Sequence, residues 1–162
     1  MLQIVSIGEE SPALDIIRTL FRAYEQELDE NLCFQSFEAE LKDPLKKYGP
    51  PAGVLLLAYW EQEVAGCIAL TPMPEEATCE MKRLYVKPAF RKYGIGKQLV
   101  LELLKMAREK SYTIMRLDTL EKLQPAIRLY EQFGFERINA YYHNPLPGVV
   151  YMEKKLDVSS VG

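Results

Sequence analysis

Hydrophobic positions along this chain form two kinds of pattern, helical spacing and short apolar runs. In residues 12–28, 94–110 and 123–135 they recur every three to four residues, which is typical of helices that bury one face. A shorter segment of the same kind covers residues 34–41. Seven other apolar runs have the length and flanking turns of strands, at residues 2–7, 53–60, 63–70, 77–88, 112–120, 135–142 and 149–156. The order of these elements predicts one α/β domain built around a mixed sheet.

Residues that favour turns and helix ends support these boundaries. Ser11 before Pro12 is a helix start, because Ser accepts a bond from a free N–H group and Pro has no N–H to leave unpaired. Glu61-Gln62 joins two apolar runs as a hairpin, and Gly134 ends the last helix. We find no repeats or linkers. We therefore expect a single domain over residues 1–162, with its core in about residues 2–156 and a frayed tail.

Composition narrows the class of protein. Hydrophobic residues make up 48% of the 162 residues and charged residues 27%, as in globular proteins. A net charge of -3 argues against binding to nucleic acid. Three unpaired cysteines and a single histidine predict neither a disulfide framework nor a metal centre. The chain also lacks a signal peptide and an apolar run long enough for a bilayer, so we expect a cytoplasmic protein without membrane contact.

The stretch RKYGIGKQ, residues 91–98, stands between a strand and a long helix. The first N–H groups of a helix have no partner within it, and they form the positive end of its dipole. Gly94 and Gly96 leave room for a ligand to approach that backbone, and Arg91, Lys92 and Lys97 add positive charge. The pattern predicts a cradle for a phosphate or pyrophosphate group.

Other interpretations of the two glycines are weaker. A nucleotide P-loop needs a glycine at position 91, which is Arg91, and Ser or Thr at position 98, which is Gln98. A dinucleotide fingerprint needs a third glycine where Leu99 stands. A turn that only packs a helix against a sheet remains the structural alternative.

Two motifs together resemble the GNAT family of acyl-CoA-dependent N-acetyltransferases. Arg91-x-x-Gly94-x-Gly96 matches the family motif (Q/R)xxGx(G/A), and AIRLYEQFGF, residues 126–135, resembles its second signature. The order of elements agrees with the family over almost the whole chain. The resemblance implies the GNAT fold, with a mostly antiparallel sheet of about seven strands that splays between the fourth and fifth. Homodimers also occur in this family, so the resemblance makes a homodimer possible.

The resemblance further implies acetyl-CoA as the cosubstrate, with no metal. Its pyrophosphate is then expected on the backbone of residues 91–97, which are Arg91, Lys92, Tyr93, Gly94, Ile95, Gly96 and Lys97. Its pantetheine arm is expected along the fourth strand at Leu84, Tyr85 and Val86. Such pairing would give partners to the two amides of the arm. The oxyanion donor is expected to be a backbone N–H near Val86.

Glu80 is the candidate general base. On an alternating strand it shares a face with Lys82, Leu84 and Val86, the expected cofactor side, while Cys79 points to the opposite face. Some family members carry a catalytic glutamate at this position, and others use chains of water instead. The structural alternative is a surface glutamate paired with Lys82.

Tyr130 is the candidate general acid, because it stands where the second signature carries a catalytic tyrosine. A phenol of pKa about 10 can donate a hydrogen bond to a departing thiolate whose conjugate acid has a pKa of about 8.5. The alternative is a core aromatic, since Ile127, Tyr130 and Phe133 share helical spacing.

The expected reaction is acetyl transfer to a primary amine of a small molecule or peptide by direct attack in a ternary complex. The rival is a non-catalytic acyl-CoA sensor, which would have no need for Glu80 and Tyr130. His143, Tyr141 and Tyr142 lie in or beside a loop that borders the acceptor site in this family, and the sequence assigns them no role. The acidic residues of the N-terminal helices attract a cationic amine or simply form a solvated face.

Overall fold

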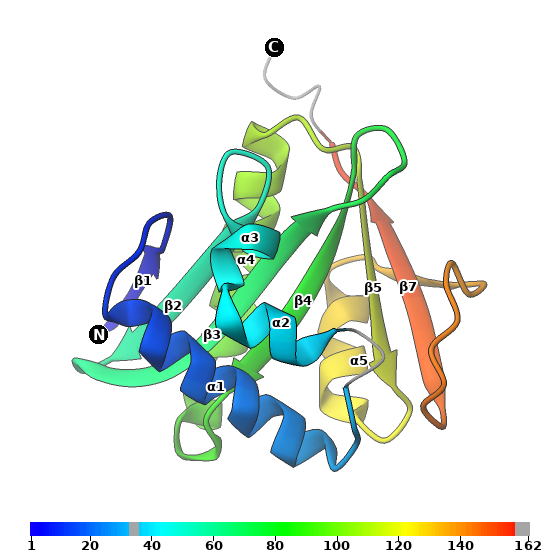
Figure 1. Ribbon diagram of the computed structural model, residues 1–162. Helices are drawn as coiled ribbons and strands as arrows, with labels where there is room; N and C mark the ends of the chain where they lie inside the picture. Colours follow the sequence, from blue (N-terminus) through cyan, green and yellow to red (C-terminus); the bar gives the residue numbers. More distant parts are fainter. Residues whose placement is uncertain (33–35, 158–162) are drawn as a thin grey trace.

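A single seven-stranded sheet organises the molecule, and its strand order confirms the expected fold class. The computed structural model describes residues 1–32 and 36–157. The sheet has the order β1-β2-β3-β4-β5-β7-β6, with only β4 and β5 parallel. The strands are β1 (Leu2–Ser6), β2 (Val54–Trp60), β3 (Glu63–Pro72), β4 (Thr78–Val86), β5 (Ile114–Leu120), β6 (Glu136–Ile138) and β7 (Val149–Lys155). The model is shown in Figure 1.

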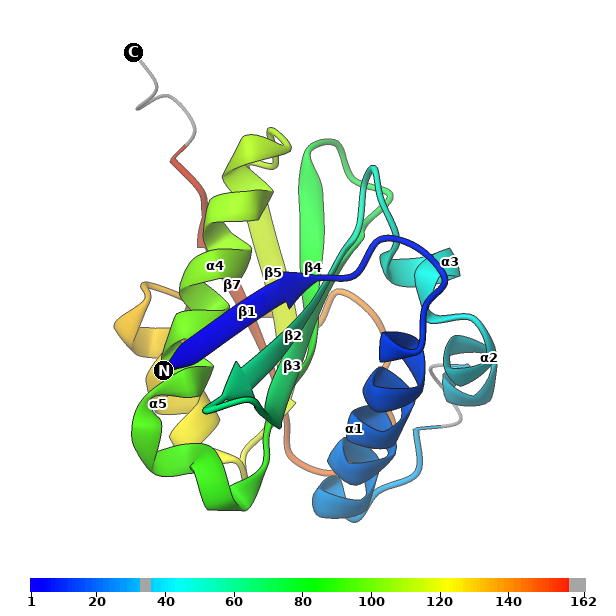
Figure 2. The same ribbon diagram turned by 90° about the vertical axis from the view of Figure 1, so that its left-hand side faces the viewer.

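Helices cover both faces of the sheet. On one face lie α1 (Ala13–Leu28), α2 (Phe37–Lys42) and α3 (Pro44–Tyr48), and on the other α4 (Ile95–Glu109) and α5 (Gln124–Gln132), as Figure 2 shows. The 3-10 helix η2 (Pro88–Tyr93) leads into α4. The sequence did not predict α3 or η2. Part of the helix expected over residues 34–41 lies outside the described residues.

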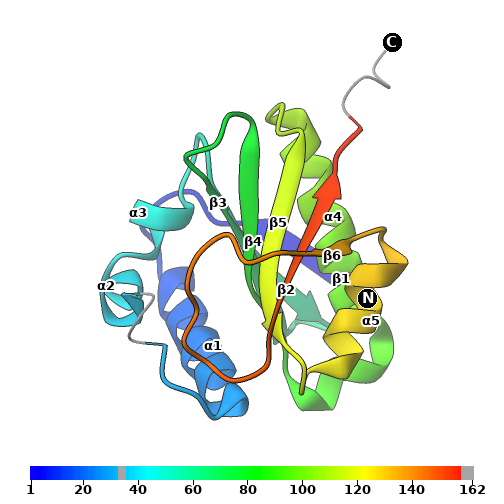
Figure 3. The same cartoon turned by 90° about the vertical axis from the view of Figure 1, so that its right-hand side faces the viewer.

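The hairpin between β2 and β3 is confirmed. Glu61 and Gln62 both have positive φ, at 49° and 70°, as a two-residue turn with the right-handed twist of the strands requires. The last hairpin differs from the expectation. The strand predicted over residues 135–142 pairs only over β6, and a loop of residues 139–148 then crosses toward α1 (Figure 3).

A bulge in β4 changes which of its side chains face α1 and which face α4. Cys67 pairs with Tyr85 and Ala69 with Lys82, so Ile68 alone stands opposite Arg83 and Leu84. Arg83 has a φ of 61°, a conformation that costs a non-glycine residue about 1–2 kcal/mol. The extra residue reverses the alternation of side chains beyond it.

The predicted common face of Glu80, Leu84 and Val86 is therefore wrong. Leu84 and Val86 pack against the core under α4, where Cys79 and Met81 also lie. Glu80 faces the side of α1 to α3, because its partner Thr71 hydrogen-bonds Lys47 of α3. Lys82 shares that side with Glu80, as its partner Ala69 belongs to the core under α1. Cys79 does point away from Glu80, as expected.

The parallel strands β4 and β5 separate soon after they meet. Only Thr78 to Glu80 pair with Ile114 to Arg116, and the remaining residues of β4 do not pair with those of β5. Figure 1 shows the two arrows diverging toward the lower end of the sheet. This confirms the predicted splay, which leaves one edge of β4 open beyond Glu80.

Candidate active site

A pocket opens where β4 and β5 separate. Five structural elements contribute to its wall: β4, β5, the C-terminal part of α1, α5 and the loop before β7. The lining residues are Tyr24, Leu28, Leu32, Met81, Lys82, Arg83, Leu84, Leu117, Asp118, Thr119, Leu120, Leu123, Ala126, Tyr130, Asn144 and Leu146. Most of them are apolar, with a few polar groups among them, as is typical of binding sites for small molecules.

Asp118 is the carboxylate that lines this pocket. It comes from β5 beyond the paired residues, and it accepts hydrogen bonds from the hydroxyl of Tyr142 and from Nδ2 of Asn144, the latter at 2.7 Å. Both donors come from the loop before β7, which the hydroxyl of Tyr151 ties down by donating to the carbonyl of Tyr142 at 2.7 Å. The loop thereby fixes the orientation of a charged group in the pocket.

Glu80 lies beside the pocket and not among its lining residues. Its Oε2 accepts a hydrogen bond from the hydroxyl of Tyr141 at 2.7 Å. Burial and the charge of Glu80 raise the pKa of Tyr141, so this tyrosine stays protonated and keeps donating. The two tyrosines left without a role by the sequence, Tyr141 and Tyr142, therefore each hold a carboxylate, whereas His143, which follows them, is exposed.

Tyr130 does line the pocket, from the C-terminal part of α5. Its side chain is 7% exposed and its ring meets that of Phe135 edge to face, with the centroids 5.9 Å apart. It is thus both a core aromatic and a pocket residue. Burial raises its pKa well above 10, and the charge of Asp118 adds to that effect. A neutral hydroxyl therefore stands in the pocket at all physiological pH values.

Two cations on β4, Arg83 and Lys82, were not among the predicted site residues. The guanidinium of Arg83 donates to both carboxylate oxygens of Glu40, at 2.8 and 3.0 Å, and both side chains are 2% exposed. Burial alone would raise the pKa of Glu40, but the bonds and charge of Arg83 outweigh it and the pKa is lowered. Glu40 thus belongs to a buried ion pair and not to a solvated helix face. Lys82, 6% exposed, is the second cation.

Main-chain N–H groups are free at the start of α4. Gln98 N–H donates to the carbonyl of Gly94 at 3.2 Å, so the N–H groups of Ile95, Gly96 and Lys97 precede the first bond of the helix. The side chain of Ile95 is fully buried, so only its backbone is available to a ligand. The side chains of Lys92, Tyr93 and Lys97 are exposed around this turn.

The two glycines of this turn, Gly94 and Gly96, differ in backbone conformation. Gly94 has a φ of 72°, which favours glycine whatever lies nearby. Gly96 is helical, and a Cβ there would meet Leu129 and Val86 at 3.7 Å, an ordinary contact. The fold itself therefore does not require glycine at position 96, where alanine would favour the helix by about 1 kcal/mol. This supports a ligand that approaches the backbone at Gly96.

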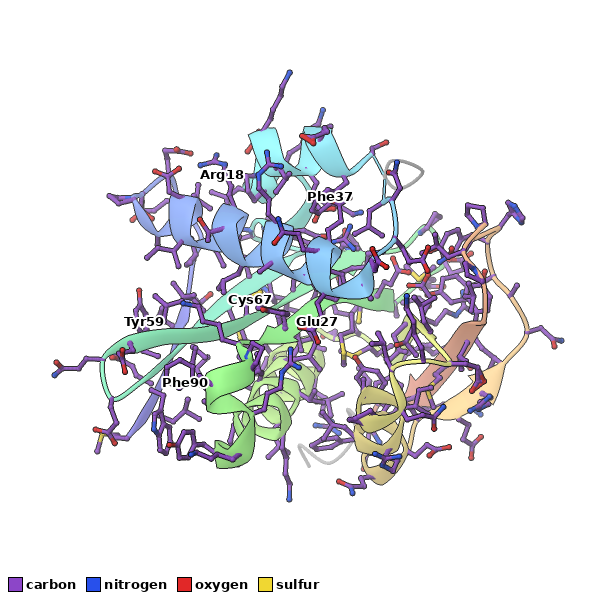
Figure 4. The ribbon with its side chains drawn as sticks, turned by 90° about the horizontal axis from the view of Figure 1, so that it is seen from below. Arg18, Glu27, Phe37, Tyr59, Cys67 and Phe90 are labelled. Atoms are coloured by element: carbon purple, nitrogen blue, oxygen red, sulfur yellow. The ribbon has the colours of Figure 1, made fainter. Side chains whose placement is uncertain are left out.

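The side chain of Arg91 binds other residues of the protein. Its Nε donates to the carbonyl of Val86 at 2.8 Å, its guanidinium lies 5.7 Å from the centre of the Tyr85 ring, and it forms an ion pair with Glu27. Figure 4 shows Glu27 on the side of α1 that faces η2. Arg91 thus links α1 to the end of β4 and holds the turn before α4 in place.

The free edge of β4 continues up to this turn. Lys87 N–H donates to Ala65 of β3 at 2.8 Å, and neighbouring amides of a strand point to opposite edges. The amides of Val86 and Leu84 therefore face the edge that β5 has left. Tyr85 pairs instead with Cys67 of β3. An extended ligand with amide groups fits this edge, and a pyrophosphate fits the N–H groups at its end, as acetyl-CoA requires.

Three further features of the described residues concern possible metal ligands, possible membrane spans and the cysteines. Residues 1–32 and 36–157 contain no group of three or more His, Cys, Asp or Glu side chains that could hold a metal ion. Within the same residues, no helix is long and apolar enough to cross a bilayer. Cys67 and Cys79 are free and buried, and Cys33 lies outside the described residues.

Comparison with known proteins identifies the family. Residues 14–135 match the model of the acetyltransferase (GNAT) family, which covers most of the chain. The chain therefore belongs to the GNAT family, and it is an acetyltransferase. An uncharacterised N-acetyltransferase of Schizosaccharomyces pombe is 45% identical over 144 residues, 88% of either chain. An uncharacterised N-acetyltransferase of Escherichia coli is 30% identical and covers 81% of this chain and 79% of its own length.

A solved structure agrees with the fold. The PaiA N-acetyltransferase of Thermoplasma acidophilum, in complex with coenzyme A, superimposes with a TM-score of 0.71 over 96% of this chain and 99% of its own. Its sequence identity of 20% makes it a guide to the fold alone.

Proposed function

We propose that the protein transfers the acetyl group of acetyl-CoA directly to a primary amine bound in the pocket between β4 and β5. The observation that carries this proposal is the separation of the two strands beyond Glu80, which creates a free edge and a pocket at once. The edge ends at the free N–H groups of Ile95 and Gly96. A thioester whose arm lies along β4 would thus reach a pocket that contains Asp118 and Tyr130.

In the proposed reaction the amine nitrogen attacks the thioester carbonyl carbon, a C–N bond forms and the C–S bond breaks. The amine must lose a proton, and the sulfur leaves as a thiolate that needs a proton or a hydrogen bond. Tyr130 supplies that hydrogen bond. Its raised pKa makes complete proton transfer to sulfur more uphill, so stabilisation by the neutral hydroxyl is the favoured role.

The proton of the amine is proposed to pass to a carboxylate. Glu80 remains the candidate from the sequence, and the structure adds Asp118, which lines the pocket directly. Both are held by tyrosine hydroxyls of the same loop. The variants Glu80→Gln and Asp118→Asn distinguish the two, because each keeps the size of the side chain and removes its charge. The base is the residue whose variant lowers kcat more while the affinity for CoA is retained.

An acyl-cysteine route is disfavoured. Burial, with a further contribution from the charge of Glu80, raises the pKa of Cys79 to about 12, so its thiol is almost never the reactive thiolate. Its side chain also belongs to the core under α4.

Release of the CoA thiol from acetyl-CoA with a panel of primary amines tests the proposal. We expect thiol release with some amines, and a decrease in kcat of about 10²–10⁴-fold in Tyr130→Phe. The affinity of that variant for CoA, measured by calorimetry, should stay at the wild-type value. A Tyr130→Phe enzyme with unchanged kcat would exclude Tyr130 from the reaction.

A further inference from the structure

Lys82 is a largely buried cation on the side of β4 that faces α1. Its side chain is 6% exposed, it comes from β4 just before the bulge, and it lines the pocket. Within residues 1–32 and 36–157, its ammonium group makes no hydrogen bond and no ion pair. Its nitrogen is not fully enclosed by protein and stays within reach of a ligand in the pocket, but a largely buried charge without a partner still lowers stability.

The neighbours of Lys82 do not remove this cost. Arg83 is adjacent but already holds Glu40 with two hydrogen bonds. Burial and the positive charge of Arg83 lower the pKa of Lys82, and the charges of Glu80 and Asp118 oppose them. An anion bound in the pocket would supply the missing partner and favour the charged form of the lysine.

The position of Lys82 indicates which molecule carries that anion. The free N–H groups of Ile95 and Gly96 lie at the start of α4, on the opposite side of the sheet from α1. Lys82 faces the side of α1, and Tyr24 and Leu28 of that helix line the same pocket. Its anion is thus separate from the pyrophosphate expected at the turn before α4.

The pocket holds two opposite charges that do not neutralise each other. Asp118 and Lys82 both line it, yet no ion pair joins them. A ligand with an amine and a carboxylate in one small molecule would satisfy both: the carboxylate next to Lys82, and the amine on the side of Asp118 and Tyr130. An amine without a negative group would leave Lys82 unpaired.

We propose that the acceptor is a small amine that carries a carboxylate, such as an amino acid, and that Lys82 binds its carboxylate. This inference rests on the proposed function. It makes Lys82 a specificity-determining residue, whereas Tyr130 and one of the two carboxylates, Glu80 or Asp118, act on the reacting atoms.

The test compares free amino acids with their carboxamides as acceptors in the thiol-release assay. We expect wild-type kcat/KM to be at least about tenfold higher for the free acid, since it gains a hydrogen bond to a charged group. The amine of a carboxamide is less basic and more of it is unprotonated at neutral pH, so this bias opposes the expected result. Lys82→Met, which keeps the length of the side chain, should abolish the preference. Lys105→Met, at an exposed position of α4, should keep it.

Each other result of this assay has a definite meaning. If amines without a carboxylate react and amino acids do not, the proposed function stands and the inference about the acceptor is wrong. If Lys82→Met lowers kcat/KM equally for both members of each pair, Lys82 acts on the acetyl group or the fold, and the inference is also wrong.

A binding measurement covers the case in which no amine reacts, which would count against the proposed function itself. N-acetyl amino acids and N-acetyl amino acid amides are added to the protein saturated with CoA, and the melting temperature is measured. A rise with the acid only, absent in Lys82→Met and present in Lys105→Met, supports carboxylate recognition. Equal shifts with acid and amide, or none with either, overturn it.

Discussion

The two faces of the sheet bury different kinds of side chain. Under α4 the core is apolar, with Leu99, Leu103 and Met152 fully buried. Under α1 to α3 the protein also buries Glu40, Lys82 and Arg83, whose exposed fractions, counted over backbone and side chain together, are 5%, 6% and 3%. Burial of charge does not favour folding, whereas apolar burial does. The difference indicates that the α4 face serves mainly stability and that the α1 face combines stability with the site.

The largest effect is expected from breaking the buried ion pair. In Arg83→Met the carboxylate of Glu40 remains buried and loses its bidentate partner, while Nζ of Lys47 stays 3.5 Å from its Oε1. Removal of one partner of such a pair lowers the free energy of unfolding by about 3–5 kcal/mol. Urea denaturation measures this loss.

The double variant Glu40→Leu with Arg83→Met is the matched control, because it removes both charges. It should recover most of the lost free energy of unfolding. If Arg83→Met alone is as stable as the wild type, the ion pair does not hold the bulge of β4, and the account of this face is wrong.

A core substitution under α4 should be nearly as costly for stability without affecting the choice of acceptor. Leu103→Ala removes a fully buried side chain, which lowers the free energy of unfolding by about 2–5 kcal/mol. Leu101→Ala on the same helix is the control, since Leu101 is 43% exposed and its loss should change stability by about 0.5 kcal/mol or less. A change in acceptor preference in Leu103→Ala would contradict the division between the two faces.

The buried charges on the α1 face should also make the free energy of unfolding depend on pH. The pKa of Glu40 is lowered in the folded protein from its ordinary value of 4.5. The unfolded chain therefore binds the proton more tightly, so the stabilisation is complete above the ordinary pKa and is lost as the pH falls through the folded value. Urea denaturation between pH 7 and pH 3 measures this loss. The double variant at Glu40 and Arg83 should show a smaller dependence, and an equal one would assign the effect to other carboxylates.

Much of the fold follows from local sequence patterns. The periods of hydrophobic residues place β2, β3 and α4 within one or two residues of their observed bounds. The hairpin turn at Glu61 and Gln62 follows from the two apolar runs that it joins. Local patterns suffice here because β2 and β3 are continuous apolar runs buried on both faces, whereas α4 buries one face and shows helical periodicity.

The site depends on features that local patterns do not contain. The bulge at Arg83 carries no glycine, and the residue that holds it, Glu40, lies 43 positions away in the sequence. The sequence therefore predicted an unbroken alternation along β4 and placed Glu80 on the wrong face relative to Leu84. Asp118 enters the pocket only because β4 and β5 separate, and the family resemblance implied that separation without naming this residue.

The smallest effect is expected at Gly96, where stability and affinity for CoA should change in opposite directions. Gly96→Ala adds a Cβ at 3.7 Å from its nearest neighbours, and alanine favours a helix, so the free energy of unfolding should rise by up to about 1 kcal/mol. The added methyl group should weaken the binding of CoA only slightly, because the family motif admits alanine as well as glycine at this position. Gly94→Ala is the matched variant: its φ of 72° opposes a side chain, so stability should fall instead. Urea denaturation without ligand and calorimetry with CoA separate the two effects. Unchanged affinity for CoA in Gly96→Ala would mean that the cosubstrate leaves room for a methyl group at this position, so that its approach does not need the glycine.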